Sequence, residues 1–99
     1  MNMQKLMMEA QKMQVKLQKE QSELENSTYE GTSALVTVVI NGKKEVISVK
    51  INMDDDFSKE DIEMLEDMFM VAMNDAVKKA DADKEKRLGK YSQGLTGLM

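Results

Sequence analysis

Two runs of β-branched residues on either side of Asn41-Gly42 constrain the fold of this chain more than any other feature. The runs are LVTVVI at residues 35–40 and VISVKI at residues 46–51. Because Asn-Gly favours the positive dihedral angles of a tight turn, the pattern predicts a β-hairpin. Alternation along the second run predicts one face in the core and the other partly solvated. A bare hairpin is only marginally stable, so a third strand or covering helices are needed, and the polar segment 26–33 has enough Thr and Tyr to supply a short strand.

The segment before the hairpin has the pattern of one long helix. Neither Gly nor Pro interrupts residues 1–30. Apolar residues recur at alternating steps of three and four, a heptad-like seam that only Glu20 interrupts. The seam consists of Met3, Leu6, Ala10, Met13, Leu17 and Leu24. Because the polar face is rich in Gln and not strongly basic, we expect the seam to pack on the protein's own core or on a partner subunit, rather than on a membrane or a target helix.

A second long helix is predicted after the hairpin. Ser58 with Asp61 resembles a capping box, with Asp in place of the usual Glu. Acidic residues occupy the first turns and basic residues the last ones, as the helix dipole favours. Gly89 is the expected stop, which gives about 30 residues and about 45 Å of helix, so one end should project or contact a partner. Residues 1–88 are therefore expected to form a single α+β domain, followed by a flexible tail over 89–99.

Composition limits the chemistry that this chain can perform. Its 99 residues include two Tyr, two Phe, no Trp, no Cys and no His. With so few aromatics the core is thin, which favours pooling apolar surface in an oligomer. The absence of Cys and His excludes thiolate nucleophiles, disulfides, imidazole metal sites and Ser-His pairs.

The acidic clusters do not replace Cys and His as metal ligands or catalytic groups. The run Asp54-Asp55-Asp56 lacks the spaced oxygens, the turn Gly and the distal Glu of a calcium loop, so a solvated loop is the better interpretation. We expect no catalytic residue, metal site, cofactor or small-molecule substrate. Charges within the first dozen residues and the lack of a long apolar run predict neither a signal peptide nor a membrane span, so a cytoplasmic protein with no membrane partner is expected.

The formal charge of −4 conceals an uneven distribution. Residues 54–67 carry eight acids against Lys59, a net charge of −7, whereas residues 1–20 have +2 and residues 78–90 have +3. Positive charge therefore lies in two blocks around an acidic middle.

The basic residues of the two positive blocks are the candidate binding groups. Spacings of seven, four and three place one set on a single helix face: Lys5, Lys12, Lys16 and Lys19. The second set lies near the end of the second helix, with Lys90 beyond it: Lys78, Lys79, Lys84, Lys86 and Arg87. Charge alone fits either simple solvation of long helices or contact with phosphates, which lysines make without reading base sequence.

Several short segments have the order and spacing of a known family. They are LMMEAQKMQ at residues 6–14, the Gly31 region, VVING at 38–42, DIEMLED at 61–67 and NDA at 74–76. On these segments the chain resembles the YbaB/EbfC family of bacterial nucleoid-associated proteins across about residues 6–80.

The resemblance implies two long helices that flank a three-stranded antiparallel sheet. It also implies a homodimer shaped like tweezers, whose helical arms grip double-stranded DNA. Members of the family are placed in the cytoplasm on the nucleoid, where they affect chromosome organisation and gene expression. The chain departs from the family pattern at Thr32-Ser33-Ala34, where a Gly-rich stretch is usual, and in lacking a Pro-Gly tail.

The two basic sets are therefore the expected DNA contacts. Arg87 is the single Arg among 14 basic residues, which argues against strong base-edge readout and for lysine–phosphate contacts with weak sequence preference. The alternative is a helical protein–protein interaction module without DNA binding, since Met occurs 11 times and is common on promiscuous surfaces.

Overall fold

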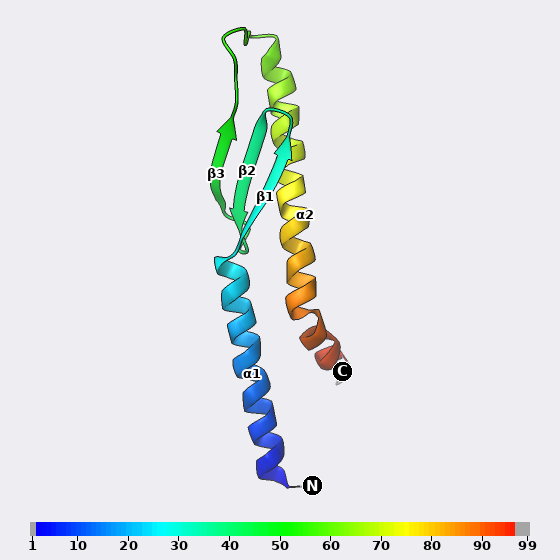
Figure 1. Ribbon diagram of the computed structural model, residues 1–99. Helices are drawn as coiled ribbons and strands as arrows, with labels where there is room; N and C mark the ends of the chain where they lie inside the picture. The colour runs from blue at the N-terminus through cyan, green and yellow to red at the C-terminus, as the bar shows by residue number, and fades with distance from the viewer. Residues whose placement is uncertain (1, 97–99) are drawn as a thin grey trace.

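The computed structural model describes residues 2–96, with side chains described as far as Tyr91. Two helices and three strands follow one another along the chain: α1 (Met3–Asn26), β1 (Thr28–Ser33), β2 (Val36–Asn41), β3 (Val46–Ile51) and α2 (Asp61–Thr96). The molecule is elongated, with principal extents of 72 × 23 × 14 Å, and α1 points away from the sheet (Figure 1). The α+β class, the hairpin and the third strand that the sequence predicts are confirmed.

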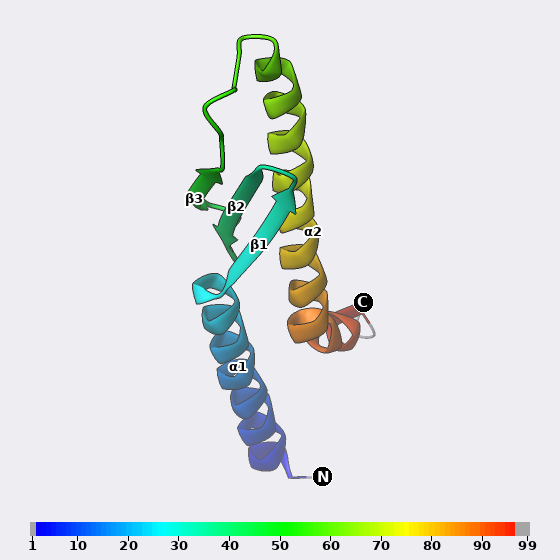
Figure 2. The same ribbon diagram turned by 45° about the horizontal axis from the view of Figure 1, so that its top comes forward.

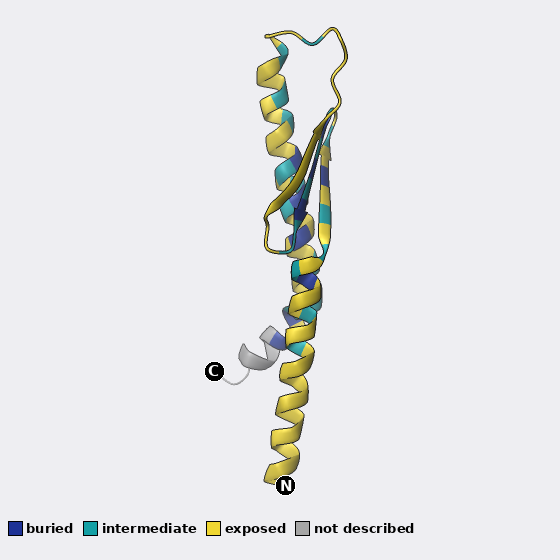
Figure 3. Cartoon of the chain, turned by 90° about the vertical axis from the view of Figure 1, so that its left-hand side faces the viewer, coloured by how far each residue is buried: buried dark blue, intermediate teal, exposed yellow. Residues whose placement is uncertain are grey.

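The sheet is antiparallel, with β2 between β1 and β3. Alternate residues of β2 are fully buried: Val36, Val38 and Ile40. They pack against small residues on one side of α2: Ala72, Ala76 and Ala80. The sheet and α2 form two layers (Figure 2), and the buried residues lie between those layers (Figure 3). Because Ala has a short side chain, the helix axis can lie close to the sheet.

Gly31 allows β1 to approach α2 even more closely. A Cβ atom at this position would lie 1.9 Å from the Ala72 carbonyl oxygen and 2.5 Å from the Ala76 nitrogen. These are backbone atoms of a packed helix, so they cannot move aside without cost. The glycine is therefore required by packing between two elements far apart in the sequence.

The β2–β3 turn differs from the tight Asn-Gly turn that the sequence predicts. Gly42 does not have a positive φ; the residue in the left-handed region is Lys44, at φ 65°. The Asn41 side chain stabilises this longer loop, because its Oδ1 accepts hydrogen bonds from the backbone N–H groups of Lys43 and Glu45 at 2.9 and 3.0 Å. Gly42 instead lies against the end of α1, where a Cβ would be 1.9 Å from the Leu24 carbonyl oxygen.

The start of α2 agrees with the predicted capping box, whereas its end does not agree with the predicted stop. The Ser58 backbone N–H donates to the Asp61 carboxylate at 2.9 Å. At the other end, α2 continues through Gly89 to Thr96 instead of stopping there. Tyr91 is buried just beyond Gly89, and this anchor outweighs the modest helical cost of one glycine. Residues 89–96 of the expected tail therefore belong to α2, and its last three residues lie outside the described part of the chain.

The seam of α1 is buried only near the end of the helix. Leu24 is buried and Leu17 is half-buried, whereas Met3, Leu6 and Met13 are 78%, 47% and 56% exposed. The first half of α1 is yellow, that is exposed, in Figure 3. The sequence predicts that the seam packs either on the protein's own core or on a partner subunit. For the first half of α1, the described chain rules out packing on its own core.

One flank of the sheet is also uncovered. Within the described residues, α2 contacts β1 and β2 and leaves β3 without a covering layer. All six residues of β3 are exposed, although Val49 and Ile51 pair with the buried positions of β2. An apolar surface therefore continues from β3 onto the neighbouring flank of α2, where Ile62 and Phe69 are 45% and 38% exposed.

Substitution of two glycines separates packing from helix propensity. We expect Gly31→Ala to lower the free energy of unfolding by about 3 kcal/mol, because the new methyl group overlaps backbone atoms of α2. Gly89→Ala is the matched control: its Cβ would meet only the flexible Glu85 carboxylate, at 2.9 Å. We expect that variant to gain about 0.5–1 kcal/mol from better helix propensity. Urea denaturation of the two variants measures both changes, and equal effects would contradict this explanation of Gly31.

Candidate nucleic-acid interface

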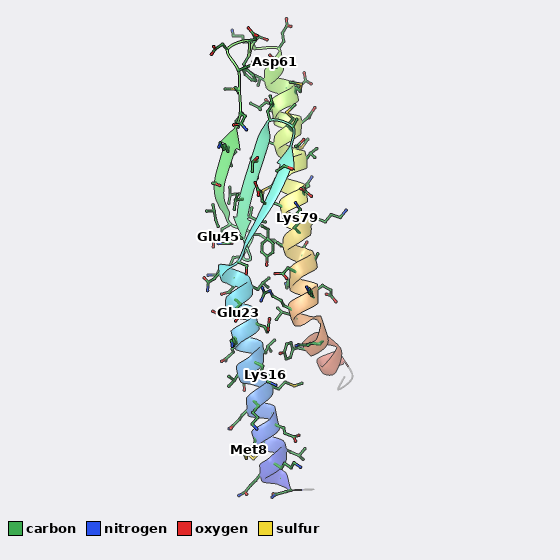
Figure 4. All side chains as sticks on the ribbon, viewed as in Figure 1. Met8, Lys16, Glu23, Glu45, Asp61 and Lys79 are labelled. Atoms are coloured by element: carbon green, nitrogen blue, oxygen red, sulfur yellow. The ribbon has the colours of Figure 1, made fainter. Side chains whose placement is uncertain are left out.

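The lysines of α1 form one exposed row along a helix that projects from the fold. Lys5, Lys12, Lys16 and Lys19 are all exposed. At 3.6 residues per turn, they fall within a sector of about 60° around the helix axis. The structure therefore brings this whole set together on one face, and Figure 4 labels Lys16 near the middle of α1.

The basic residues of α2 point in several directions instead of forming one row. Lys86 lines a hollow with Glu20 of α1, so it faces the other helix. Lys84 lines a different hollow with Asp81 and Leu88, away from α1. The Lys79 ammonium donates to the Glu30 carbonyl oxygen at 2.8 Å and pairs with Asp75 at 3.3 Å, so it secures β1 to α2. Lys78 is exposed one residue earlier on the helix.

Lysines from both helices meet at an open hollow between α1 and the end of α2. The hollow has a volume of about 430 Å³. Its lining consists of Glu9, Lys12, Met13, Lys16, Lys90 and Tyr91. The Lys90 ammonium lies 5.1 Å from the centre of the Tyr91 ring, within the range of a cation–π contact.

Lys90 is the residue that the sequence-based set of expected contacts lacks. It follows Lys86 by four positions, and residues four apart share a helix face. This spacing is the sequence pattern that could have added Lys90 to the expected contacts. The tail was expected to be flexible beyond residue 88, however, and only the continuation of α2 through Gly89 places Lys90 on the same face.

Arg87 lies in a cluster of carboxylates and does not point freely into solvent. Its Nε donates to Asp83 at 2.9 Å, and its Nη1 lies 3.2 Å from Glu23 and 3.4 Å from Glu20. Tyr29 of β1 completes the cluster by donating its hydroxyl hydrogen to Asp83. The guanidinium thus connects α2 to two residues of α1 and, through Asp83, to the sheet.

The cluster perturbs the protonation of its members in consistent directions. Hydrogen bonds from Tyr29 and then from Arg87 hold the pKa of Asp83 below its usual range. Burial, followed by the hydrogen bond to Asp83, raises the pKa of Tyr29. The hydrogen bond to Asp83 also raises the pKa of Arg87. At neutral pH the Tyr29 phenol is therefore protonated, the Asp83 carboxylate is ionised and the Arg87 guanidinium is charged, as these hydrogen bonds require.

The acidic block lies at the opposite end of the molecule from the lysine row. The loop between β3 and α2 and the first turn of α2, where Figure 4 labels Asp61, lie at one end; Met8 of α1 lies at the other. The molecule is 72 Å long, and the net −7 of residues 54–67 lies toward one end of it while the row on α1 lies toward the other. The charge asymmetry seen along the sequence is thus also an asymmetry in space.

The described part of the chain offers neither a metal centre nor a membrane-spanning helix. In the described part of the chain, no group of three or more acidic residues could hold a metal ion. No described helix is long and apolar enough to cross a membrane. The arrangement offers positively charged surfaces on projecting helices, which suits binding to an extended anionic partner.

This combination of fold and surface is that of a binding protein with basic helices, and comparison with known sequences identifies the family. A sequence model described as the YbaB/EbfC DNA-binding family matches residues 1–95, and the chain belongs to this family. The family is one of nucleoid-associated DNA-binding proteins and not of enzymes.

Proteins from several bacteria are similar to this chain over nearly its whole length. A nucleoid-associated protein of Clostridium kluyveri is 42% identical over 96 residues, which cover 95% of this chain and 83% of the relative. One from Lactococcus lactis subsp. cremoris is 43% identical, covering 96% of this chain and 97% of the relative. Another, from Chloroflexus aurantiacus, is 42% identical and covers 99% of each chain.

The carboxylate cluster makes stability depend on pH in a specific way. Because Asp83 has a lower pKa when folded than its usual value of 3.8, its contribution to stability is present above that value and is lost as the pH falls through the lower folded pKa. We expect Asp83→Asn to destabilise the protein at pH 7. The difference between the two proteins should shrink below about pH 4.

Urea denaturation between pH 7 and pH 2.5 measures this difference. Asp55→Asn, which removes an acidic side chain from the exposed loop, is the control for loss of charge alone. If Asp83→Asn destabilises the protein equally at every pH in this range, the pH-dependent stability does not come from ionised Asp83.

Proposed function

We propose that this chain is a nucleoid-associated protein that grips double-stranded DNA as a homodimer with little sequence specificity. It acts in the cytoplasm on the nucleoid, where it helps to organise the chromosome and thereby affects gene expression. Its relatives carry the name nucleoid-associated protein, and its family is described as DNA-binding. No catalytic residue, cofactor, membrane or small-molecule substrate enters the proposal.

The observation that carries the proposal is the exposed lysine row on α1, at the far end of the molecule from the acidic block. Duplex DNA carries one negative charge per about 1.7 Å of its axis, so a row of ammonium groups along a helix meets a matching row of phosphates. Acidic residues beside the DNA would weaken binding, and the densest acidic block, residues 54–67, lies at the other end of the molecule. Net charge of the whole chain, −4, therefore does not oppose the interaction.

The lysines differ in how directly they can contact phosphate. The first group lines one of the two hollows between the helices or belongs to the row along α1: Lys5, Lys12, Lys16, Lys19, Lys86 and Lys90. Lys78 and Lys84 are exposed on other faces of α2 and are assigned to longer-range attraction. Lys79 can add its charge to that attraction while it holds β1, and Arg87 is already bound by carboxylates.

Weak sequence specificity follows from the type of the basic residues. Specific base contacts in the major groove are made most often by Arg, whose planar fork matches guanine. The only Arg of this chain is Arg87, and its guanidinium is hydrogen-bonded to three carboxylates. Lysine ammonium groups act as point charges that position a protein on phosphates without reading base sequence.

Self-association is supported by the uncovered apolar surface beside β3. A hollow of about 480 Å³ lies between Ile51 of β3 and the first half of α2. Its α2 wall includes Ile62, Phe69 and Met70, which are 45%, 38% and 58% exposed. Monomeric proteins rarely leave such contiguous apolar surface in water. A second copy of the chain is the proposed occupant, and it would supply a second lysine-bearing arm to the same duplex.

Salt dependence tests the contact with phosphate. We expect the double variant Lys12→Gln, Lys16→Gln to lose four phosphate contacts per dimer, which reduces the slope of log affinity against log salt by about 3.6. The matched control, Lys43→Gln with Lys50→Gln, removes the same charge from exposed positions in the β2–β3 loop and on β3, and should keep most of the slope. Fluorescence anisotropy with a labelled duplex from about 50 to 300 mM salt measures both.

Three results would contradict the DNA-binding proposal. They are absence of binding at low salt, a flat salt dependence, and equal losses in the two double variants. Absence of DNA binding together with retention of a stoichiometric protein partner would favour the alternative, a methionine-rich interaction module.

Substitutions on the two flanks of α2 test the dimer surface. Phe69→Glu places a charge in the hollow beside β3, so we expect it to convert the dimer to monomer in sedimentation equilibrium. Val71→Glu is the matched control, two residues away on the same helix, where the side chain is 55% exposed but does not line the hollow. We expect Val71→Glu to remain dimeric. A monomeric wild-type protein, or equal effects of the two variants, would refute this assignment.

A further inference from the structure

We propose that Arg87 is a positioning residue that fixes the direction of α1 relative to α2, and so sets the distance between the lysines on the two sides of the hollow. This role concerns the direction of α1 within one chain. Its consequence for DNA rests on the function proposed above.

The contacts of Arg87 join three elements that are far apart in the sequence. On α1 its guanidinium reaches Glu20 and Glu23, which are one turn apart. On α2 it binds Asp83, which is one turn before it, and Asp83 accepts the hydroxyl hydrogen of Tyr29 from β1. A guanidinium has five N–H donors in a rigid planar fork, so one side chain can hold several carboxylates in fixed directions.

The end of α1 has a second attachment point close to the sheet. Leu24 is buried, and Gly42 of the β2–β3 turn packs on its backbone. This contact fixes where α1 ends but does not by itself fix the direction of the helix. The ion pairs at Glu20 and Glu23 supply the second contact, and two contacts along a helix define its direction.

The direction of α1 has large consequences at the lysine row. Lys5 lies 15 residues from Glu20, or about 22 Å along the helix, so a rotation of 10° at Glu20 moves the tip by about 4 Å. A shift of that size exceeds the length of an ammonium–phosphate contact. Lys12 and Lys16 line the hollow together with Lys90, which is three residues beyond Arg87, so the cluster lies directly next to the basic surface.

Charge in the cluster opposes a direct role of Arg87 on DNA. Three carboxylates surround one guanidinium, so the cluster carries excess negative charge even with Arg87 in place. Movement of Arg87 to a phosphate would break its ion pairs with Glu20, Glu23 and Asp83 and leave these carboxylates beside the anionic backbone. The positioning role therefore replaces, for this residue, the phosphate contact expected from the sequence.

A distance measurement tests the proposal in the DNA-free protein. Because the chain has no Cys, nitroxide labels at Gln14→Cys on α1 and Ala82→Cys on α2 give one defined pair per chain; both positions are exposed. Dilution with unlabelled chains isolates the distance within one protomer. Double electron–electron resonance then reports both the mean distance and its spread.

Three substitutions distinguish the roles of charge and geometry. We expect Arg87→Met and Tyr29→Phe to broaden the distance distribution, the second without any change in charge. Lys84→Met, which also removes a positive charge from α2 but faces away from α1, should leave the distribution unchanged. Unchanged distributions in both Arg87→Met and Tyr29→Phe, or equal broadening in Lys84→Met, would overturn the proposal.

DNA titration of Tyr29→Phe gives the second readout. We expect affinity to fall about tenfold through loss of a hydrogen bond to a charged group, although no basic residue is removed. Broadened distances with unchanged affinity would overturn the role in DNA binding. Failure of the wild-type protein to bind DNA would overturn the proposed function instead, and the distance measurement would still decide whether Arg87 positions α1.

Discussion

The packing of β1 and β2 on the alanine stripe of α2 is the interaction on which the rest of the structure depends. Gly31 and the small side chains of Ala72 and Ala76 allow strand and helix backbones to come into direct contact. Because so little side-chain volume separates the layers, the chain obtains a well-packed core with few aromatic residues. A long α2 then extends beyond this core and provides the surface against which α1 is aligned.

The narrow core has two consequences that bear on function. First, a single helix cannot cover three strands, so β3 and the adjoining flank of α2 keep their apolar side chains exposed. Second, little of α1 can pack within the chain, and the helix projects with its lysine row in solvent. The same geometry that leaves the core thin therefore creates both the candidate dimer surface and the candidate DNA-binding arm.

Sequence periodicity predicted the elements well because it reports local preferences. The hairpin, the two long helices and the common face of Lys12 and Lys16 all follow from spacing within one segment. The Ser58–Asp61 cap is also local, and its hydrogen bond is present. Predictions were wrong where a distant contact outweighed a local preference. Gly89 does not end α2, since Tyr91 is buried just beyond it.

By itself, the sequence determined the order of helices and strands, the lysine-bearing face of α1 and the absence of Cys and His chemistry. These properties depend on residue type and on spacing within a segment. Only the tertiary structure decided what individual residues do. It placed Gly42 against Leu24 instead of in a tight turn, and Lys90 beside the lysines of α1. It also enclosed Arg87 in three carboxylates, two of which are more than 60 residues away, and no local pattern can encode contacts between segments so far apart.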